Sequence, residues 1–462
     1  MVNFLPEKIR IYFSKGNERS RLTKKNIAAA FLLKGVTILI SLILIPLTIN
    51  YIGPEGNGIW VTLYSMIVWL NLFDIGFGNG LKNKLAEAKA RGETTLAQQY
   101  ISSTYAWVSL ICAGIFIAFF LVNPCLDWLK ILGSNVQTMA YQQEIPGLVW
   151  IFLIAFCFSF VLNLIKSIVA ADQRPAIGSF LDMLGQLLTL LGIFILSKTT
   201  TPSLIALGWV TAFAPVVVYI VAHIVLFGGR YKSWAPSFSL IDMKLGINLL
   251  RLGFQFFIAT VASVVVTQTL PFLINHMSNP TEVTNFNTAF RLFSVAFNAM
   301  ALVIIPYWSS FTDAYTQQDF VWMKKSVKQL HRMFLLLLVG EALILVLSPY
   351  IYYLWVNYWM NEDKVLDISM LMSAAICLYV CMLCWINLNI YPLNGIGKVR
   401  LQVYSSIVEI IVLIPIALFL GKHWGAIGVV LAPTIVYLPR MIWAPIQLRK
   451  LINNRATGIW NQ

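Results

Sequence analysis

Apolar runs of about twenty residues recur along the whole chain, which is the length that an α-helix needs to cross a hydrocarbon core ~30 Å thick. Inside such a core every backbone N–H and C=O group must be satisfied within the chain, so helices or closed barrels are what can span it. Of the 462 residues, 11% are charged and 59% are hydrophobic, a balance that a soluble domain of this size does not tolerate. The sequence therefore predicts an all-α polytopic membrane protein.

The apolar runs predict about twelve transmembrane helices in two halves of six. Their expected bounds are 26–50, 58–80, 100–122, 146–169, 176–196, 204–227, 246–275, 283–310, 332–358, 367–392, 401–420 and 425–447. The predicted domains are a basic tail (1–25), a first six-helix bundle (26–228), a linker (229–245), a second six-helix bundle (246–447) and a final tail (448–462). An even number of spans in each half gives both halves the same orientation.

Positive charges lie mainly on one side of this predicted topology. With the N-terminus in the cytoplasm, 25 of the 33 Lys and Arg residues fall on the cytoplasmic side and four on the other. This bias is the positive-inside signature, and it predicts that the tail, the linker and both termini are cytoplasmic. The formal charge of +14 is thus a topology signal, and no nucleic-acid partner is predicted.

Two cations lie deep within predicted spans. Lys34 interrupts the first span, and Arg291 falls about nine residues into the eighth, ~13 Å from its outer end at 1.5 Å per residue. A charge at this depth is costly and by default faces a bundle interior or a watery path. Two such cations suit an anionic cargo group, especially a phosphate or diphosphate. The alternative for each is an ion pair with an acid of the spans, namely Asp74, Asp182, Glu341 or Glu409.

Three further cations, Lys166, Arg251 and Arg440, lie near expected span ends, where long side chains extend to the interface. Arg251 is kept as a third candidate for the diphosphate, because the opening of the seventh span (LLRLG) is weakly similar to that of the first (LLKG).

Two acids, Asp74 and Glu341, are candidates for coupling transport to an ion gradient, because a buried carboxyl can load and release a proton. The alternative role is that of a charge partner. Asp74 begins the pattern DIGFGNG, which lacks the strand and the helix start of a phosphate-binding loop. Its glycines instead predict close helix packing or local unwinding.

Signatures of catalysis are not found in the sequence. There is no nucleophile elbow, Walker loop or dinucleotide fingerprint, and the histidines have no metal-ligand spacing. Cys377, Cys381 and Cys384 have a spacing known from iron–sulfur sites, but within a membrane helix it describes one helical face. We therefore predict no catalytic residue, no metal and no cofactor.

The turn GPEGNGIW after the first span, the segment LFDIGFGNGLKNKLAEAKARGE closing the second, and twelve spans in two halves resemble the polysaccharide and O-antigen flippases. These belong to the multidrug/oligosaccharidyl-lipid/polysaccharide exporter superfamily. The resemblance implies two six-helix bundles forming a V around a central cavity, with alternating access. It also implies cationic cavity residues, a role that Lys34 and Arg291 match, whereas the drug-exporting branch has a carboxylate in its first span.

The cargo implied by this resemblance is an undecaprenyl-diphosphate-linked oligosaccharide, moved across a bacterial inner membrane. Downstream polymerase and chain-length proteins are the implied partners. One alternative is a multidrug antiporter of the same fold. Another is a membrane glycan polymerase or ligase, a class that commonly has a large outer loop with arginines, whereas the longest outer loop here (123–146) holds one lysine.

Overall fold

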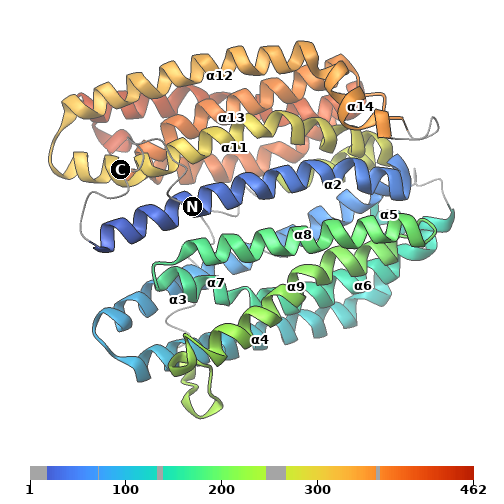
Figure 1. Cartoon of the computed structure of the whole chain (residues 1–462). Helices are drawn as coiled ribbons and strands as arrows, with labels where there is room; N and C mark the ends of the chain where they lie inside the picture. Colours follow the sequence, from blue (N-terminus) through green and yellow to red (C-terminus); the bar gives the residue numbers. More distant parts are fainter. Residues whose placement is uncertain (1–17, 71, 133–138, 246–266, 360–364, 462) are drawn as a thin grey trace, which may run out of the picture. The chain divides into compact units, whose positions relative to one another are not determined.

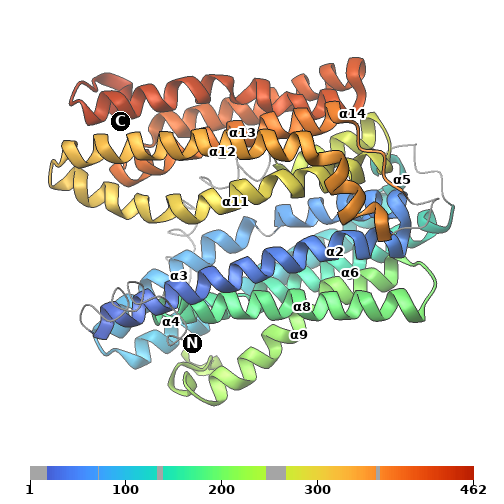
Figure 2. The same cartoon turned by 45° about the horizontal axis from the view of Figure 1, so that its top comes forward.

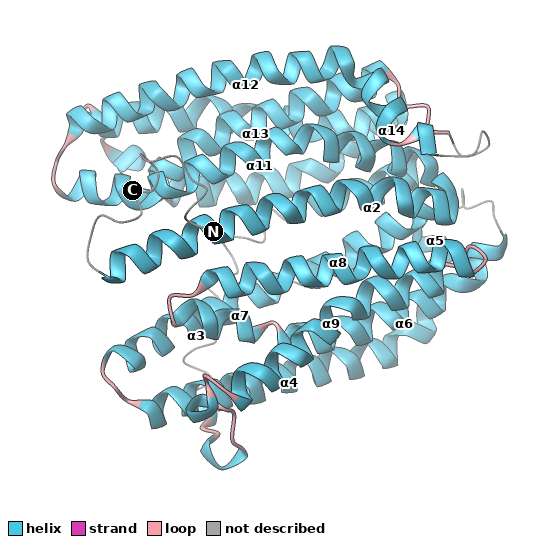
Figure 3. Cartoon of the chain, viewed as in Figure 1, coloured by secondary structure: helices cyan, strands magenta, loops and turns pink. Residues whose placement is uncertain are grey.

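The computed structural model describes residues 18–70, 72–132, 139–245, 267–359 and 365–461 (Figure 1). Helices, short 3-10 turns and loops make up this part of the chain, and no strand occurs in it (Figure 3). Eight of its helical segments are long and apolar enough to cross a membrane. The all-α membrane fold is thereby confirmed, whereas the count of twelve spans stays a prediction.

Two very long helical segments each contain two predicted spans. Helices α2 (Glu18–Leu70) and α14 (Arg400–Ile452) have 53 residues each. A straight helix of that length would measure ~80 Å, well over twice the ~30 Å hydrocarbon core. The backbone breaks at Gly53 (φ 76°) and Gly425 (φ 58°), in the left-handed region that glycine adopts without strain. The break predicted at residues 51–58 is therefore confirmed at Gly53.

The first compact unit comprises residues up to Leu47, Leu70–Trp128 and Gln143–Thr260. Its helices include α3 (Leu72–Ala90), α4 (Thr94–Val122), α6 (Met139–Leu162), α7 (Leu164–Ala171), α8 (Pro175–Thr199) and α9 (Leu204–Gly228). Helices α8 and α9 lie side by side in both views (Figures 1 and 2). Ser203 caps α9, since its hydroxyl accepts a hydrogen bond from the Ala206 amide at 3.2 Å.

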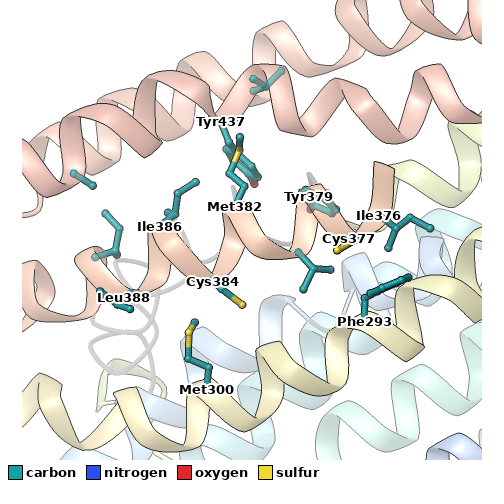
Figure 4. Packing of buried hydrophobic residues seen from close by; sticks show 14 of the residues in the cluster. Phe293, Met300, Ile376, Cys377, Tyr379, Met382, Cys384, Ile386, Leu388 and Tyr437 are labelled. Atoms are coloured by element: carbon teal, nitrogen blue, oxygen red, sulfur yellow. The ribbon is translucent and has the colours of Figure 1, made fainter. Parts of the chain in front are cut away.

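The second unit comprises Thr48–Trp69, Leu129–Gln142 and Val261–Gln462. It contains α11 (Pro280–Thr316), α12 (Phe320–Trp355), α13 (Met370–Ile396) and α14. The central helix is α13, which packs against the other three. In Figure 4, Met300 of α11 points toward Cys384 of α13, and Tyr379 stacks on Tyr437 with ring centroids 6.5 Å apart. The predicted division at residues 229–245 into two six-helix bundles stays a prediction.

The surface of α12 shows how a membrane helix distributes its side chains. Leu336 is 74% exposed and Val346 66% exposed, as expected for a face that contacts lipid. Glu341 lies between them in sequence but is 1% exposed. The helix therefore turns these two apolar side chains outward and this carboxyl inward.

The longest outer loop of the predicted topology, residues 123–146, contains the short helix α5 (Trp128–Leu132). The glycine-rich pattern after Asp74 is helical throughout, within α3, and Gly78 and Gly80 are buried. Of the two structures predicted for that pattern, close packing is therefore the one found, and local unwinding is wrong.

Candidate functional site: charged residues of the helices

Arg291 is exposed on α11, eleven residues after the helix begins at Pro280. The Asn279 side chain caps this helix, accepting a hydrogen bond from the Glu282 amide at 2.9 Å. Within the described part of the chain no carboxylate forms an ion pair with the Arg291 guanidinium. The Tyr64 phenol lies close enough to interact with its charge. Arg291 thus offers an accessible, unneutralised cation on a helix of the second unit.

Lys34 is also exposed, on the α2 part of the first unit. Leu32 and Val36 beside it are 65% and 43% exposed, so the ammonium sits on an otherwise apolar surface. No acid among the described side chains pairs with it. The alternative that Lys34 and Arg291 are neutralised by Asp182, Glu341 or Glu409 finds no support in the described ion pairs.

Glu341 is buried, and neither of its carboxylate oxygens has a hydrogen-bond partner among the described residues. The Cys377 thiol approaches its backbone carbonyl at 3.9 Å, which places α13 next to it. Burying an unpaired ionised carboxylate costs on the order of several kcal/mol. A carboxyl without partners at this position is less costly in its protonated form, which is the form from which a coupling group would release a proton.

Asp74 and Arg251 lie outside the structural description in different ways. Asp74 belongs to α3, but its side chain is not among those described. Arg251 falls in residues 246–266, outside the described residues. The roles predicted for both, including a pair between Asp74 and Lys34, stay predictions.

Two cations that we expected to extend to the interface are ion-paired instead. Lys166 lies 3.0 Å from Asp182, which also accepts a hydrogen bond from the Tyr219 hydroxyl at 3.0 Å. Arg440 lies 2.6 Å from Glu409, with side chains 12% and 7% exposed. The interface prediction for Arg440 is wrong, because the two limbs of α14 on either side of Gly425 bring this acid against it.

Two serine hydroxyls complete the Arg440 site. A terminal guanidinium nitrogen donates to Ser405 at 3.1 Å and to Ser406 at 2.5 Å. The pair is therefore buried and tied to two hydroxyls through one terminal nitrogen, whereas Arg440 Nε has no hydrogen-bond partner among the described residues.

Sequence reasoning missed a cluster around Asp172, which directly follows α7. Its carboxylate accepts hydrogen bonds from Lys89, from Arg230 Nε at 3.0 Å and from the Tyr231 hydroxyl at 2.8 Å. Arg174 Nε lies 3.4 Å away. Burial alone would raise the pKa of Asp172, but the hydrogen bonds from Lys89, Tyr231 and Arg230 outweigh it and hold this pKa below its ordinary value. A sequence signal existed: Asp172 is an acid in a short, otherwise basic loop.

The turn that carries the family resemblance, residues 53–60, is a packing element. A Cβ on Gly58 would lie 1.7 Å from the carbonyl oxygen of Pro280, so the two backbones touch. The Asn57 amide donates to Thr284 Oγ1 at 3.1 Å, and that hydroxyl donates to the Pro54 carbonyl at 2.6 Å. This turn therefore fastens the segment Thr48–Trp69 to the start of α11, within the second unit.

In the part of the chain that the structure describes, many candidate spans, a buried ion pair and cations that no carboxylate neutralises are typical of the class of polytopic membrane transporters. Comparison with known proteins makes this specific. The family model described as "Polysaccharide biosynthesis protein" matches residues 23–312. The chain belongs to this family.

Similar proteins agree with this assignment. A curated protein of Salmonella typhi named "Putative O-antigen transporter" is 19% identical over 432 residues, covering 90% of this chain and 93% of the relative. An inward-facing multidrug resistance MATE family transporter of the MOP superfamily has a TM-score of 0.75 at 14% identity, covering 92% of this chain and 100% of that one. The lipid II flippase MurJ has a TM-score of 0.71 at 14% identity, covering 92% of this chain and 90% of that one. The fold is that of the MOP superfamily.

Proposed function

We propose that the protein is a flippase that moves undecaprenyl-diphosphate-linked oligosaccharide from the cytoplasmic to the periplasmic leaflet of a bacterial inner membrane by alternating access. The observation that carries this proposal is Arg291, an exposed guanidinium on a membrane helix with no described carboxylate to neutralise it. The family match and the O-antigen relative supply the cargo class.

A diphosphate that leaves water loses the hydrogen bonds of its hydration shell. Cations with fork-like donors can replace these hydrogen bonds. Lys34 and Arg291, with Arg251 as a third candidate, would bind this group while the glycan occupies a wet path. The lysine in the first span favours an anionic cargo over a cationic drug. Polymerase and chain-length proteins would consume the product outside.

Energy for the step would come from an ion gradient or from consumption of the product outside, because no nucleotide-binding motif is found in the sequence. Glu341 is one coupling candidate, since it is buried and neither carboxylate oxygen has a hydrogen-bond partner in the part of the chain that the structure describes. Asp74 is the other, next to the glycines of α3. Glu341→Gln keeps the size and the neutral state of the side chain, so it should fold normally and lose coupling if Glu341 carries the proton.

The cargo is tested in a deletion strain of the source bacterium complemented with wild type or Arg291→Ala. We expect loss of surface glycan with accumulated lipid-linked units in the deletion and in the alanine variant. Altered drug sensitivity with intact surface glycan would refute the flippase and favour the multidrug antiporter. Glycan extension by the purified protein in detergent would instead favour a polymerase or ligase.

Coupling is tested in liposomes by measuring translocation with and without an imposed proton gradient. Wild type should respond to the gradient, and either Glu341→Gln or Asp74→Asn should not. If both variants respond as wild type does, the coupling site lies elsewhere.

A further inference from the structure

Three cations surround the single carboxylate of Asp172, so the cluster keeps a surplus of two positive charges. The carboxylate is 4% exposed, whereas the side chains of Lys89, Arg174 and Arg230 are 41%, 35% and 47% exposed. The buried acid therefore holds the three cations together, and their excess charge faces outward. Like charges held this close repel one another unless an anion joins them.

The neighbouring charges of α3 are arranged differently. Lys84 and Arg91 both pair with Glu87, whose side chain is 43% exposed. Such an exposed acid is hydrated and holds its partners weakly. The cluster at Asp172 instead rests on a buried acid that also accepts a hydrogen bond from Tyr231. Burial and the adjacent carboxylate raise the pKa of the Tyr231 phenol, so it remains a donor.

Each of the two arginines has donor nitrogens that do not bind Asp172. Arg230 donates to the carboxylate through Nε, and Arg174 also approaches it through Nε. Their terminal nitrogens make no hydrogen bond to this carboxylate. A guanidinium fork is the donor geometry that matches a phosphate. Helix α8 begins at Pro175, directly after Arg174, and its positive dipole end adds to the attraction for an anion.

The cluster gathers three segments that the charge bias predicts to be cytoplasmic: the end of α3, the turn between α7 and α8, and the loop after α9. We propose that Lys89, Arg174 and Arg230 form a binding site for a lipid-borne phosphate at the cytoplasmic membrane surface. The site includes neither Lys34 nor Arg291. Two lipids carry the required chemistry, an anionic phospholipid through its headgroup and a lipid-linked sugar through its diphosphate.

The test is calorimetric titration of the purified, detergent-solubilised protein with inorganic pyrophosphate. Arg174→Gln/Arg230→Gln should weaken binding at least tenfold, because it removes both forks. The matched control Lys84→Gln/Arg91→Gln removes two cations paired with exposed Glu87, so it should change the affinity less than twofold. The proposal is overturned if the wild type does not bind pyrophosphate. It is also overturned if both double variants weaken binding equally, because that result would mean a general charge effect.

A second variant covers the case in which the glutamine variant fails to fold. Arg174→Lys/Arg230→Lys keeps both charges and can keep the pairs with Asp172, but it lacks the forks. It should melt as wild type does and bind pyrophosphate three- to tenfold more weakly. Unchanged affinity in this folded variant overturns the role assigned to the guanidinium groups.

The lipid source is then distinguished in nanodiscs of phosphatidylglycerol or phosphatidylcholine. Phosphatidylglycerol could suppress pyrophosphate binding, relative to phosphatidylcholine, in the protein that has both arginines and not in the variant that lacks them. In that case the site takes a phospholipid headgroup. If binding is equal in both lipids, the site selects a diphosphate. Both results support a phosphate site.

Discussion

Glu409→Gln is expected to destabilise the protein strongly, because it leaves the Arg440 guanidinium buried without its counter-charge. The two side chains are 7% and 12% exposed and lie 2.6 Å apart. Removing one partner from a buried ion pair costs ~3–5 kcal/mol. Arginine cannot relieve that cost by losing its proton, because a guanidinium stays protonated in proteins.

The reverse change, Arg440→Met, should cost less. It leaves a carboxyl that can take up a proton and become neutral, and methionine fills the apolar space. We expect about 1–3 kcal/mol, within the range for one unsatisfied buried polar group. The double variant Glu409→Gln/Arg440→Met should be no less stable than Arg440→Met alone. The two changes are therefore strongly non-additive.

The assay is reversible unfolding of the purified protein in sodium dodecyl sulfate, followed by tryptophan fluorescence. Lys166→Met and Asp182→Asn supply the matched control, because that pair is 30% and 45% exposed. An exposed pair contributes at most about 1 kcal/mol, so this second cycle should be nearly additive. Additive effects at Glu409 and Arg440 would refute the reasoning, as would an undisturbed Glu409→Gln variant.

Four further outcomes are expected. Arg291→Ala should abolish or severely lower export and Arg291→Lys should retain part of it, since a point charge holds a phosphate without the bidentate fork; full export by the alanine variant would remove this residue from the site. Lys34→Glu should lower export more than Lys34→Ala, because repulsion adds to lost attraction, and equal export would assign Lys34 to packing. Gly58→Ala should lower the melting temperature, since its Cβ would lie 1.7 Å from a backbone oxygen of α11. Gly35→Ala is the control: its Cβ would have no atom within 4 Å, so this variant should melt as wild type does. Although burial raises the pKa of Asp172, its hydrogen bonds hold that pKa below the ordinary value, so its contribution to stability is present above about pH 4 and is lost as the pH falls further. Asp172→Asn should therefore melt below wild type at pH 7, and a melting difference that closes already at pH 6 would contradict this assignment.

The membrane class, the helical fold and the break at Gly53 could be predicted from the sequence because each depends on a short stretch of chain. The length of an apolar run sets whether a helix can span the bilayer, whatever packs against it. A glycine in a turn permits a positive φ that other residues avoid. The turn at residues 53–60 could likewise be recognised as a family motif, although its role in packing against Pro280 and Thr284 could not be predicted.

Which charges are paired was decided by the tertiary structure. Lys166 meets Asp182 from 16 positions away, and Asp172 binds Lys89 and Arg230 from 83 and 58 positions away. Such pairs depend on how each helix is rotated and which helix packs beside it, so composition and spacing along one helix do not encode them. The same packing buries Glu341 with no hydrogen-bond partner among the described residues and leaves Arg291 exposed, a difference that their positions in apolar spans do not predict.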